Sequence, residues 1–140
     1  MATLRELCQR VGYSLHSGQS VLEAAQYMTE RKVGAVAILD EDRLAGILSE
    51  RDVLTKVVAQ GLDPAKTLVS AVMTPNPVVV DISESMENCL RLMNQANFRH
   101  LPVVEDGRLM GMVSLRDLLQ AQVGEQAHEI RMMRAYIYSS

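Results

Sequence analysis

The chain carries one short motif twice, first as Gly46-Ile47-Leu48-Ser49-Glu50-Arg51-Asp52 and again, 65 positions later, as Gly111-Met112-Val113-Ser114-Leu115-Arg116-Asp117. Each copy is an apolar run closed by Ser, followed by Arg-Asp and by apolar residues at helical spacing. This pattern predicts a strand that turns directly into a helix. The start of such a helix presents backbone N–H groups and the positive end of its dipole, which suit a bound anion. We therefore expect the two motifs to be the binding part of the protein.

The motif also has a simpler interpretation, because Ser-x-x-Asp is a helix-capping sequence. In a capping box the Ser hydroxyl accepts from the third helical N–H, and the acid accepts from the N–H of the Ser. Two features favour binding in addition. Arg51 and Arg116 place a cation in the first helical turn, where it opposes the dipole unless an anion is present. Gly46 and Gly111 stand where a strand avoids glycine unless another backbone or a ligand comes close. Capping and binding are compatible, and we favour binding.

Composition places the chain among ordinary soluble domains. Of its 140 residues, 48% are apolar and 22% are charged, which suffices for one domain with its own core. The formal net charge of −3 gives no electrostatic footprint for nucleic acid. Cys8 and Cys89 show no metal-ligand spacing, so we expect core residues of a reducing compartment and no metal site. Because no apolar run reaches the roughly 18 residues of a membrane span and no signal peptide is visible, we expect a cytoplasmic protein without membrane contact.

The motif belongs to a longer internal repeat. Residues 20–54 align with residues 85–119 at the same offset without a gap and share nine identities, six of them between the hairpin turn and the final helix. Apolar periodicity predicts a strand, a helix, two strands joined by a hairpin turn, and a helix in each unit. The expected strands are 13–15, 33–39 and 44–48, then 78–80, 101–104 and 109–113; the expected helices begin at Leu4, Val21, Glu50 and Met86, and the one from Glu50 runs to about Gln60.

We therefore predict an α/β (α+β) fold of two β-α-β-β-α repeats, related by a pseudo-twofold axis and packed sheet to sheet. Neither unit alone buries both faces of its sheet, whereas two copies do. Residues 1–140 form a single module, with the first repeat at 4–62 and the second at 70–123. A short N-terminal helix precedes them, and a helical tail at 124–140 follows. We expect the tail to pack on the module or on a dimer partner, the alternative being that it docks another protein.

Three stretches carry a family resemblance: the repeated motif, Met73-Thr74-Pro75 before the second repeat, and Arg99-His100-Leu101-Pro102-Val103-Val104 in its second strand. They resemble tandem cystathionine-β-synthase (CBS) domains, the pair called a Bateman module, and are close to small bacterial proteins that consist of one such pair. The resemblance implies that the cleft between the repeats binds an adenine nucleotide and that two chains form a disc-shaped homodimer. It also implies that the Asp holds the ribose hydroxyls, that Ser and Arg reach phosphate, and that the second strand with its neighbours encloses the adenine.

Side-chain chemistry supports these implied roles. An ionised carboxylate accepts two hydrogen bonds from a ribose diol, and Arg presents a fork of donors to phosphate. Arg99 and His100 stand where the first repeat has uncharged Gly34 and Ala35, so the two sites should differ. Pro102 cannot donate a strand hydrogen bond, which predicts an edge or a ligand there. The expected nucleotide-binding residues are Gly34, Val36, Ile47, Ser49, Arg51, Asp52, Thr74, Arg99, His100, Pro102, Met112, Ser114, Arg116 and Asp117.

The predicted function is that of a regulatory module that binds AMP, ADP, ATP or NAD(H) as a sensor of energy or redox state. Arg51, Arg99, His100 and Arg116 favour a phosphate-bearing ligand over the cationic S-adenosylmethionine. We expect no enzyme and no catalytic cofactor, because no nucleophile elbow, P-loop or dinucleotide fingerprint occurs. The alternative is a ligand-independent module for protein interaction or dimerisation.

The expected macromolecular partners are a second copy of the chain and a regulated protein. Two helical stripes are duplicated, and we expect them to form part of a twofold dimer interface because each small unit offers little interior to receive them. These stripes are Val21/Ala25/Met28 and Met86/Leu90/Met93.

Overall fold

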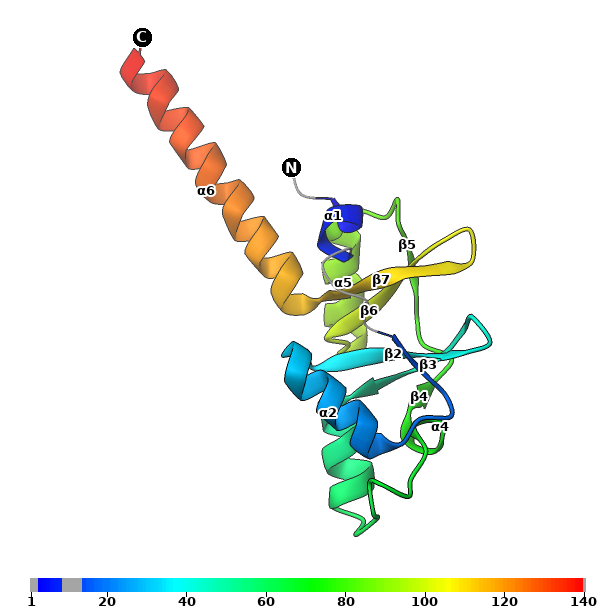
Figure 1. Ribbon diagram of the computed structural model, residues 1–140. Coiled ribbons are helices and arrows are strands. Elements are labelled where there is room, and N and C mark those ends of the chain that lie inside the picture. Colours follow the sequence, from blue (N-terminus) through cyan, green and yellow to red (C-terminus); the bar gives the residue numbers. More distant parts are fainter. Residues whose placement is uncertain (1–2, 9–13, 140) are drawn as a thin grey trace.

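The computed structural model describes residues 3–8 and 14–139 and shows two stacked sheets with helices on their outer faces (Figure 1). The elements up to residue 75 are α1 (Leu4–Cys8), β1 (Ser14–His16), α2 (Val21–Arg31), β2 (Ala35–Asp40), β3 (Arg43–Ser49), α3 (Glu50–Asp52), the π-helix η1 (Val53–Val58), α4 (Val69–Val72) and β4 (Thr74–Pro75). The later elements are β5 (Val80–Asp81), α5 (Met86–Ala96), β6 (His100–Glu105), β7 (Arg108–Ser114) and α6 (Leu115–Ser139).

Local sequence signals define the first helix of each repeat in the same way. The Ser20 and Ser85 hydroxyls each accept a hydrogen bond of 3.1 Å from the backbone N–H three residues later, so both helices begin with a side-chain cap. Both helices end at a residue in the left-handed conformation, Lys32 and Asn97, each with φ of 57°. The matching caps explain why the two helices have the same length.

The two sheets repeat the same pairing and register. The first has strand order β1-β2-β3-β4 and the second β5-β6-β7, with a parallel pair followed by an antiparallel hairpin in each. A bulge interrupts the register at equivalent positions, after Ile38 and after Val103. Ala35, Ala37 and Met112 are buried together between the sheets. The predicted sheet-to-sheet packing of two repeats is therefore confirmed.

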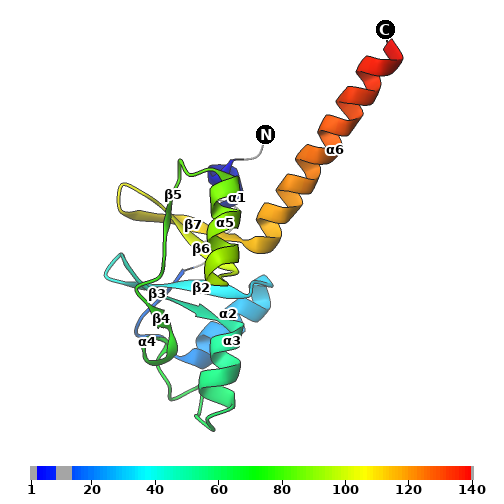
Figure 2. The same cartoon turned by 180° about the vertical axis from the view of Figure 1, so that it is seen from behind.

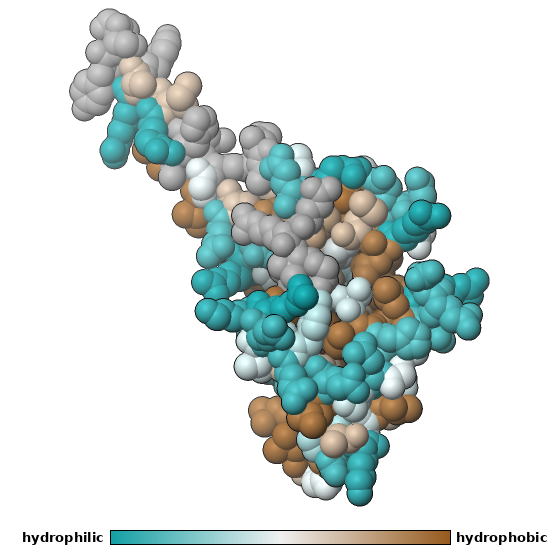
Figure 3. All heavy atoms as spheres, in the orientation of Figure 1, coloured by the Kyte–Doolittle hydropathy of each residue, from teal (hydrophilic) through white to brown (hydrophobic). Residues whose placement is uncertain are grey.

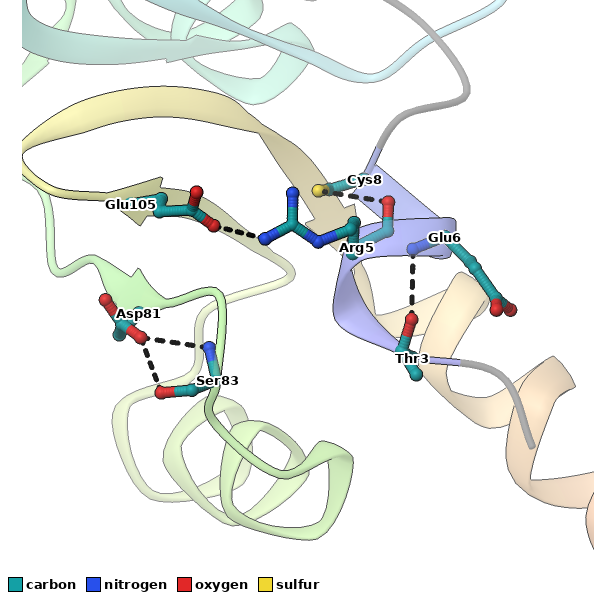
Figure 4. A network of polar contacts seen from close by, with 7 residues as sticks. All are labelled: Thr3, Arg5, Glu6, Cys8, Asp81, Ser83 and Glu105. Carbon is teal, nitrogen blue, oxygen red and sulfur yellow. Dashed lines mark hydrogen bonds and ion pairs between the residues drawn. The ribbon is translucent and has the colours of Figure 1, made fainter.

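The segments that precede each repeat are exchanged between them. Helix α1 comes before the first repeat in the chain, but Leu4 and Leu7 are buried in the core of the second. Helix α4 comes before the second repeat, but Val69 and Val72 are buried in the core of the first. An ion pair from Arg5 of α1 to Glu105 at the end of β6 joins the exchanged helix to the second repeat (Figure 4). Each hydrophobic core is thus built from both parts of the chain.

This exchange explains the glycine of the repeated motif. A Cβ atom at Gly111 would lie 2.1 Å from the Cys8 carbonyl oxygen, and one at Gly46 would lie 2.7 Å from the Thr74 carbonyl oxygen. From the sequence, we expected either another backbone or a ligand to lie close to these glycines. In both copies the group that lies close is the backbone of the exchanged segment. The two glycines are therefore packing requirements, and they no longer support binding.

The helices that follow the two motifs differ from each other. After the first motif, the expected helix to about Gln60 is one short α-helical turn, α3, that passes into η1 and ends at Val58. The Thr55 hydroxyl donates to the Arg51 carbonyl at 2.8 Å within this segment, a side-chain contact that competes with regular α-helical bonding. After the second motif, α6 continues for 25 residues. The repeat symmetry therefore stops where the last helices begin.

The C-terminal part of α6 extends away from the body of the molecule (Figures 1 and 2). The predicted tail at 124–140 is the continuation of the second repeat's last helix, which passes through Gly124 without a break. Val123 is 63% exposed and Met133 is 64% exposed, so the expected packing of the tail on its own module is wrong. Packing on a dimer partner stays a prediction.

Two further expectations need correction. The predicted dimer stripes are largely internal, because Val21, Met28 and Met93 are buried in the cores of their own repeats. The small units therefore do have an interior that receives them. The strand expected at 78–80 is found as β5, shifted to Val80–Asp81. Part of the strand expected at 13–15 lies outside the described residues, and the rest is β1.

Candidate functional site

A cleft of about 1030 Å³ lies between the two repeats. One wall is the end of α2 and the start of β2, and the other is the end of β7 and the start of α6, which lie next to each other in both views (Figures 1 and 2). The lining residues of the first repeat are Ala25, Met28, Thr29, Lys32, Val33, Gly34, Ala35, Glu50 and Val53. Those of the second are Arg99, His100, Met112, Val113, Ser114, Leu115, Arg116, Asp117, Leu119 and Gln120.

The second motif forms a capping box at the mouth of this cleft. The Asp117 N–H donates to the Ser114 hydroxyl oxygen at 3.0 Å, and the Ser114 N–H donates to Oδ2 of Asp117 at 3.2 Å. Within the described part of the chain, Oδ1 of Asp117 has no hydrogen-bond or ion-pair partner. Capping therefore uses one carboxylate oxygen of Asp117 and leaves the other available to a ligand.

The first motif forms the same capping box but has no free oxygen. The bonds between Ser49 and Asp52 measure 3.0 and 3.1 Å, and the Lys56 ammonium lies 3.1 Å from Oδ1 of Asp52. Asp52 is only 9% exposed, and neither it nor Ser49 lines the cleft. The counterpart of Lys56 in the second repeat is Ala121, which offers no charge. The two motifs therefore differ in charge pairing, because among the described residues Asp52 has a lysine partner and Asp117 does not.

Arg99 and His100 stand at the start of β6 and face the first repeat across the cleft. The Leu115 N–H donates to the Arg99 carbonyl at 2.8 Å, which fixes the start of α6 beside this strand. A Cβ atom at Gly34 would lie 3.6 Å from Cε1 of His100 and 3.3 Å from a carboxylate oxygen of Glu50. Gly34 therefore leaves the space in which the imidazole and this carboxylate come together.

The environment of His100 disfavours its protonation. Burial lowers the pKa of His100, and the nearby Arg99 guanidinium lowers it further, whereas the Asp117 and Glu50 carboxylates act in the opposite direction. Burial is the largest of these effects. The imidazole is thus held in its neutral form beside two carboxylates and an arginine.

The cleft brings together half of the predicted site residues: Gly34, Arg99, His100, Met112, Ser114, Arg116 and Asp117. The other predicted residues do not line it: Val36, Ile47, Ser49, Arg51, Asp52, Thr74 and Pro102. Val36 and Pro102 are buried within their sheets, and Ile47 packs between the sheets. Thr74 pairs with β3 at the edge of the first sheet. Of the first motif, Glu50 lines the cleft, whereas the residues of that motif that were predicted to bind do not.

Sequence reasoning missed the contribution of α2. Lys32 at its C-cap and Met28 one turn earlier line the cleft, together with Glu50. Their approach to the second motif depends on how the two repeats pack, which periodicity does not reveal. A signal was nevertheless present in the charge of Lys32, because a cation at a helix C-terminus next to Gly34 is well placed to reach an anion.

The lining combines three kinds of chemistry. Lys32, Arg99 and Arg116 supply cations, and the start of α6 supplies the positive end of a helix dipole. The free oxygen of Asp117 suits hydroxyl donors. Met28, Met112 and Leu119 are apolar residues among these lining groups, and thioether side chains adapt well to flat rings. A ligand with an anionic group, hydroxyls and a ring matches this distribution.

Two other kinds of site are not found in the described residues. No group of three or more His, Cys, Asp and Glu side chains there could hold a metal ion. No described helix is long and apolar enough to cross a membrane.

The fold and the cleft define a class of protein built from two tandem α/β repeats with a cleft at their junction. The chain belongs to the CBS domain family, whose model matches residues 4–59 and 69–124. Both matched segments begin with the exchanged helices α1 and α4.

Curated relatives share the family but differ in length. The chain is 37% identical over 118 residues to the CBS domain-containing protein CBSCBSPB2 of Arabidopsis thaliana, covering 84% of this chain but only 22% of that protein. It is 32% identical over 127 residues to the CBS domain-containing protein YhcV of Bacillus subtilis, covering 91% of this chain and 90% of the relative. The pair of repeats thus occurs both as part of longer proteins and nearly alone.

Solved structures show two kinds of ligand on similar folds. A CBS domain protein of Pyrobaculum aerophilum complexed with AMP is 28% identical, with a TM-score of 0.76 over 83% of this chain and 89% of that chain. Hypoxic Response Protein I with two coordinated zinc ions is 31% identical, with a TM-score of 0.72 over 86% of this chain and 99% of that chain.

Proposed function

We propose that this chain is a regulatory module that binds an adenine nucleotide in the cleft between its repeats. AMP, ADP, ATP and NAD(H) share the features that the cleft accommodates: a ribose, at least one phosphate and an adenine ring. CBS pairs are regulatory modules, and the AMP complex of the relative from Pyrobaculum aerophilum supports the choice of an adenylate. In this proposal the module senses the energy or redox state of the cell and acts on a regulated protein.

The observation that carries the proposal is the second motif. Asp117 holds one carboxylate oxygen in the capping box and keeps the other free, next to Arg116 in a cleft that Arg99 also lines. A ribose diol donates to the free oxygen while a phosphate meets the cations and the positive end of the α6 dipole. The first motif offers no such oxygen, because Asp52 is paired with Lys56. We therefore place the nucleotide at the second motif, with the first repeat supplying the opposite wall.

Titration calorimetry with AMP tests this assignment. In Asp117→Asn the amide oxygen still accepts the capping bond from Ser114, so the helix start is kept while the charge is lost. A hydrogen bond to a charged group contributes roughly 1.5–3 kcal/mol, which corresponds to a loss of about ten- to a hundredfold in affinity. Asp52→Asn is the matched control and should bind AMP as the wild type does. Unchanged affinity in Asp117→Asn would remove the ribose assignment.

A second function is favoured by one specific observation, the exposed apolar residues of α6. In that case the cleft is structural and the chain acts as a ligand-independent interaction module. Mass spectrometry of small molecules released from the purified protein separates the two functions. An adenylate that copurifies supports the nucleotide module, whereas a protein that neither carries nor binds any adenylate is an interaction module.

A further inference from the structure

The projecting part of α6 presents a regular apolar seam. Leu119, Val123, Gln126, Ile130 and Met133 are all exposed, and their spacings alternate between four and three residues. Alternating spacings of four and three residues are those of the a and d positions of a coiled coil. Apolar side chains are visible along this helix in the space-filling view (Figure 3). The seam is exposed from Val123 onward, and Leu119 at its start is partly exposed at the edge of the cleft that it also lines.

The helix also lacks the contacts that normally maintain such a structure. Leu118 is buried and holds the start of α6 in the core of the second repeat. From Val123 onward, every side chain that the structure describes is exposed. Isolated helices of about this length are marginal in water, and most helices in proteins are stabilised by packing of an apolar face. Gly124 lowers the intrinsic stability of this segment further. The projecting segment therefore needs a partner.

We propose that the seam pairs in parallel with the same seam of a second copy of this chain, forming a two-stranded coiled coil. In heptad notation Val123 and Ile130 occupy position a, and both are β-branched. Leu119 and Met133 occupy position d and are unbranched at Cβ. β-branched residues at a with Leu at d favour parallel dimers over higher oligomers.

The polar residues of the seam agree with this choice of partner. Gln126 is the one polar residue among the five seam positions 119–133, and a single polar core residue fixes register and oligomer state at some cost in stability. Gln120 and Gln122 flank the seam without charge, so two identical copies meet there without like-charge repulsion. A heterologous partner would not require a seam that complements itself.

Disulfide trapping tests the pairing directly in the full chain. Position a faces its own counterpart across a parallel dimer, so Ile130→Cys should form a disulfide-linked dimer when oxidised glutathione is added at low micromolar protein. The matched control is Ala135→Cys, which is exposed on the same helix but lies at the outer position f. It should stay largely monomeric on a non-reducing gel. The native Cys8 and Cys89 are buried, and burial raises the pKa of the Cys89 thiol to about 11, so they give little background.

Sedimentation of an uncross-linked variant completes the test. Ile130→Asp places a charge in the seam without touching the core. In sedimentation it should lack the dimerisation that depends on α6, and it should keep its AMP affinity. Equal cross-linking of the two cysteine variants, or none in either, would overturn the parallel pair. Unchanged association of Ile130→Asp would overturn it as well. Association through another surface of the body does not affect the cross-linking result, because the cysteines report on the helix pair itself.

Discussion

Asp52 and Asp117 occupy identical motifs, and one residue four positions later makes them different. Lys56 pairs with Asp52, whereas Ala121 leaves Asp117 with an oxygen that only a ligand can use. Sequence reasoning located the asymmetry of the repeats at Arg99 and His100 but treated the two carboxylates as equivalent. The helical spacing of i and i+4 was visible in the sequence, and it predicts such an ion pair. The difference between the two sites could therefore have been predicted from position 56 as well.

Arg99 should distinguish ligands by their phosphate content. It lines the cleft together with Lys32 and Arg116, so we expect it to meet the phosphates of a bound nucleotide. Because Coulomb energies scale with charge, Arg99→Ala should cost more affinity for ADP and ATP than for AMP, and least for adenosine. Calorimetry with this series in both proteins measures the effect. Equal losses for all four ligands would show that Arg99 does not contact phosphate.

His100 should make stability depend on pH. Burial lowers the pKa of His100 in the folded protein below the ordinary value of about 6.5, so the unfolded chain binds more protons in this range. Its contribution to the free energy of unfolding is complete above pH 6.5 and is lost as the pH falls through the folded-state pKa. Urea unfolding at pH 7.5 and pH 5 should show a smaller decrease for His100→Gln than for the wild type. An identical decrease in His100→Gln and the wild type would contradict the assignment.

At the scale of elements, Gly111 and Gly124 differ in the effect that an added side chain should have. Gly111 is closely packed, whereas Gly124 lies in an exposed helix. A side chain at Gly111 would meet the backbone of the exchanged segment, and backbone does not yield as a flexible side chain does. Gly111→Ala should therefore lower the free energy of unfolding by about 1–3 kcal/mol or more, as overpacking does. Gly124 lies in the exposed part of α6 with nothing within 4 Å of a Cβ, so Gly124→Ala should stabilise this helix by roughly 0.5–1 kcal/mol. Urea unfolding and helical circular dichroism check the pair, and a neutral Gly111→Ala would show that the exchanged segment moves freely.

The elements themselves were largely predictable because their signals are local. The caps at Ser20 and Ser85 and the alternation of the strands come from neighbouring residues, so the order within each repeat follows from the sequence. The exchange of α1 and α4 was missed, although the constant offset that aligns the repeats also aligns Leu4 with Val69 and Leu7 with Val72. The unbroken path of α6 through Gly124 was missed because glycine normally suggests a helix end. The exchange depends on tertiary packing, and the unbroken α6 depends on a helix that tolerates a glycine in its interior.

At the scale of the whole molecule, the packing of the two repeats forms the cleft. The differences between the repeats place the free carboxylate oxygen of Asp117 and two of the cations on the side of the second repeat. The repeat pattern was enough to predict that the site lies between two units. It was not enough to choose the residues that face one another, because the end of α2 meets the start of α6 only through the packing of the two sheets. Val36 and Pro102 had been expected in the site but are buried instead, Val36 in the core of the first repeat. The geometry between repeats, rather than the motif alone, selects the lining.

A ligand in this cleft should therefore protect both repeats at once. Hydrogen exchange with AMP at a hundred times its dissociation constant should slow in residues 28–35 of the first repeat and 112–120 of the second, because each segment forms one wall. Binding at this concentration adds about 2.7 kcal/mol to the stability of the folded state. The backbone of residues 54–58 in η1, where Leu54 and Val58 are exposed and do not line the cleft, should exchange as in the free protein beyond that global effect. Asp117→Asn should reduce the protection at the same AMP concentration, and Asp52→Asn should keep it. Protection confined to one repeat would mean that the ligand binds on a single wall and that the opposite repeat has no part in recognition.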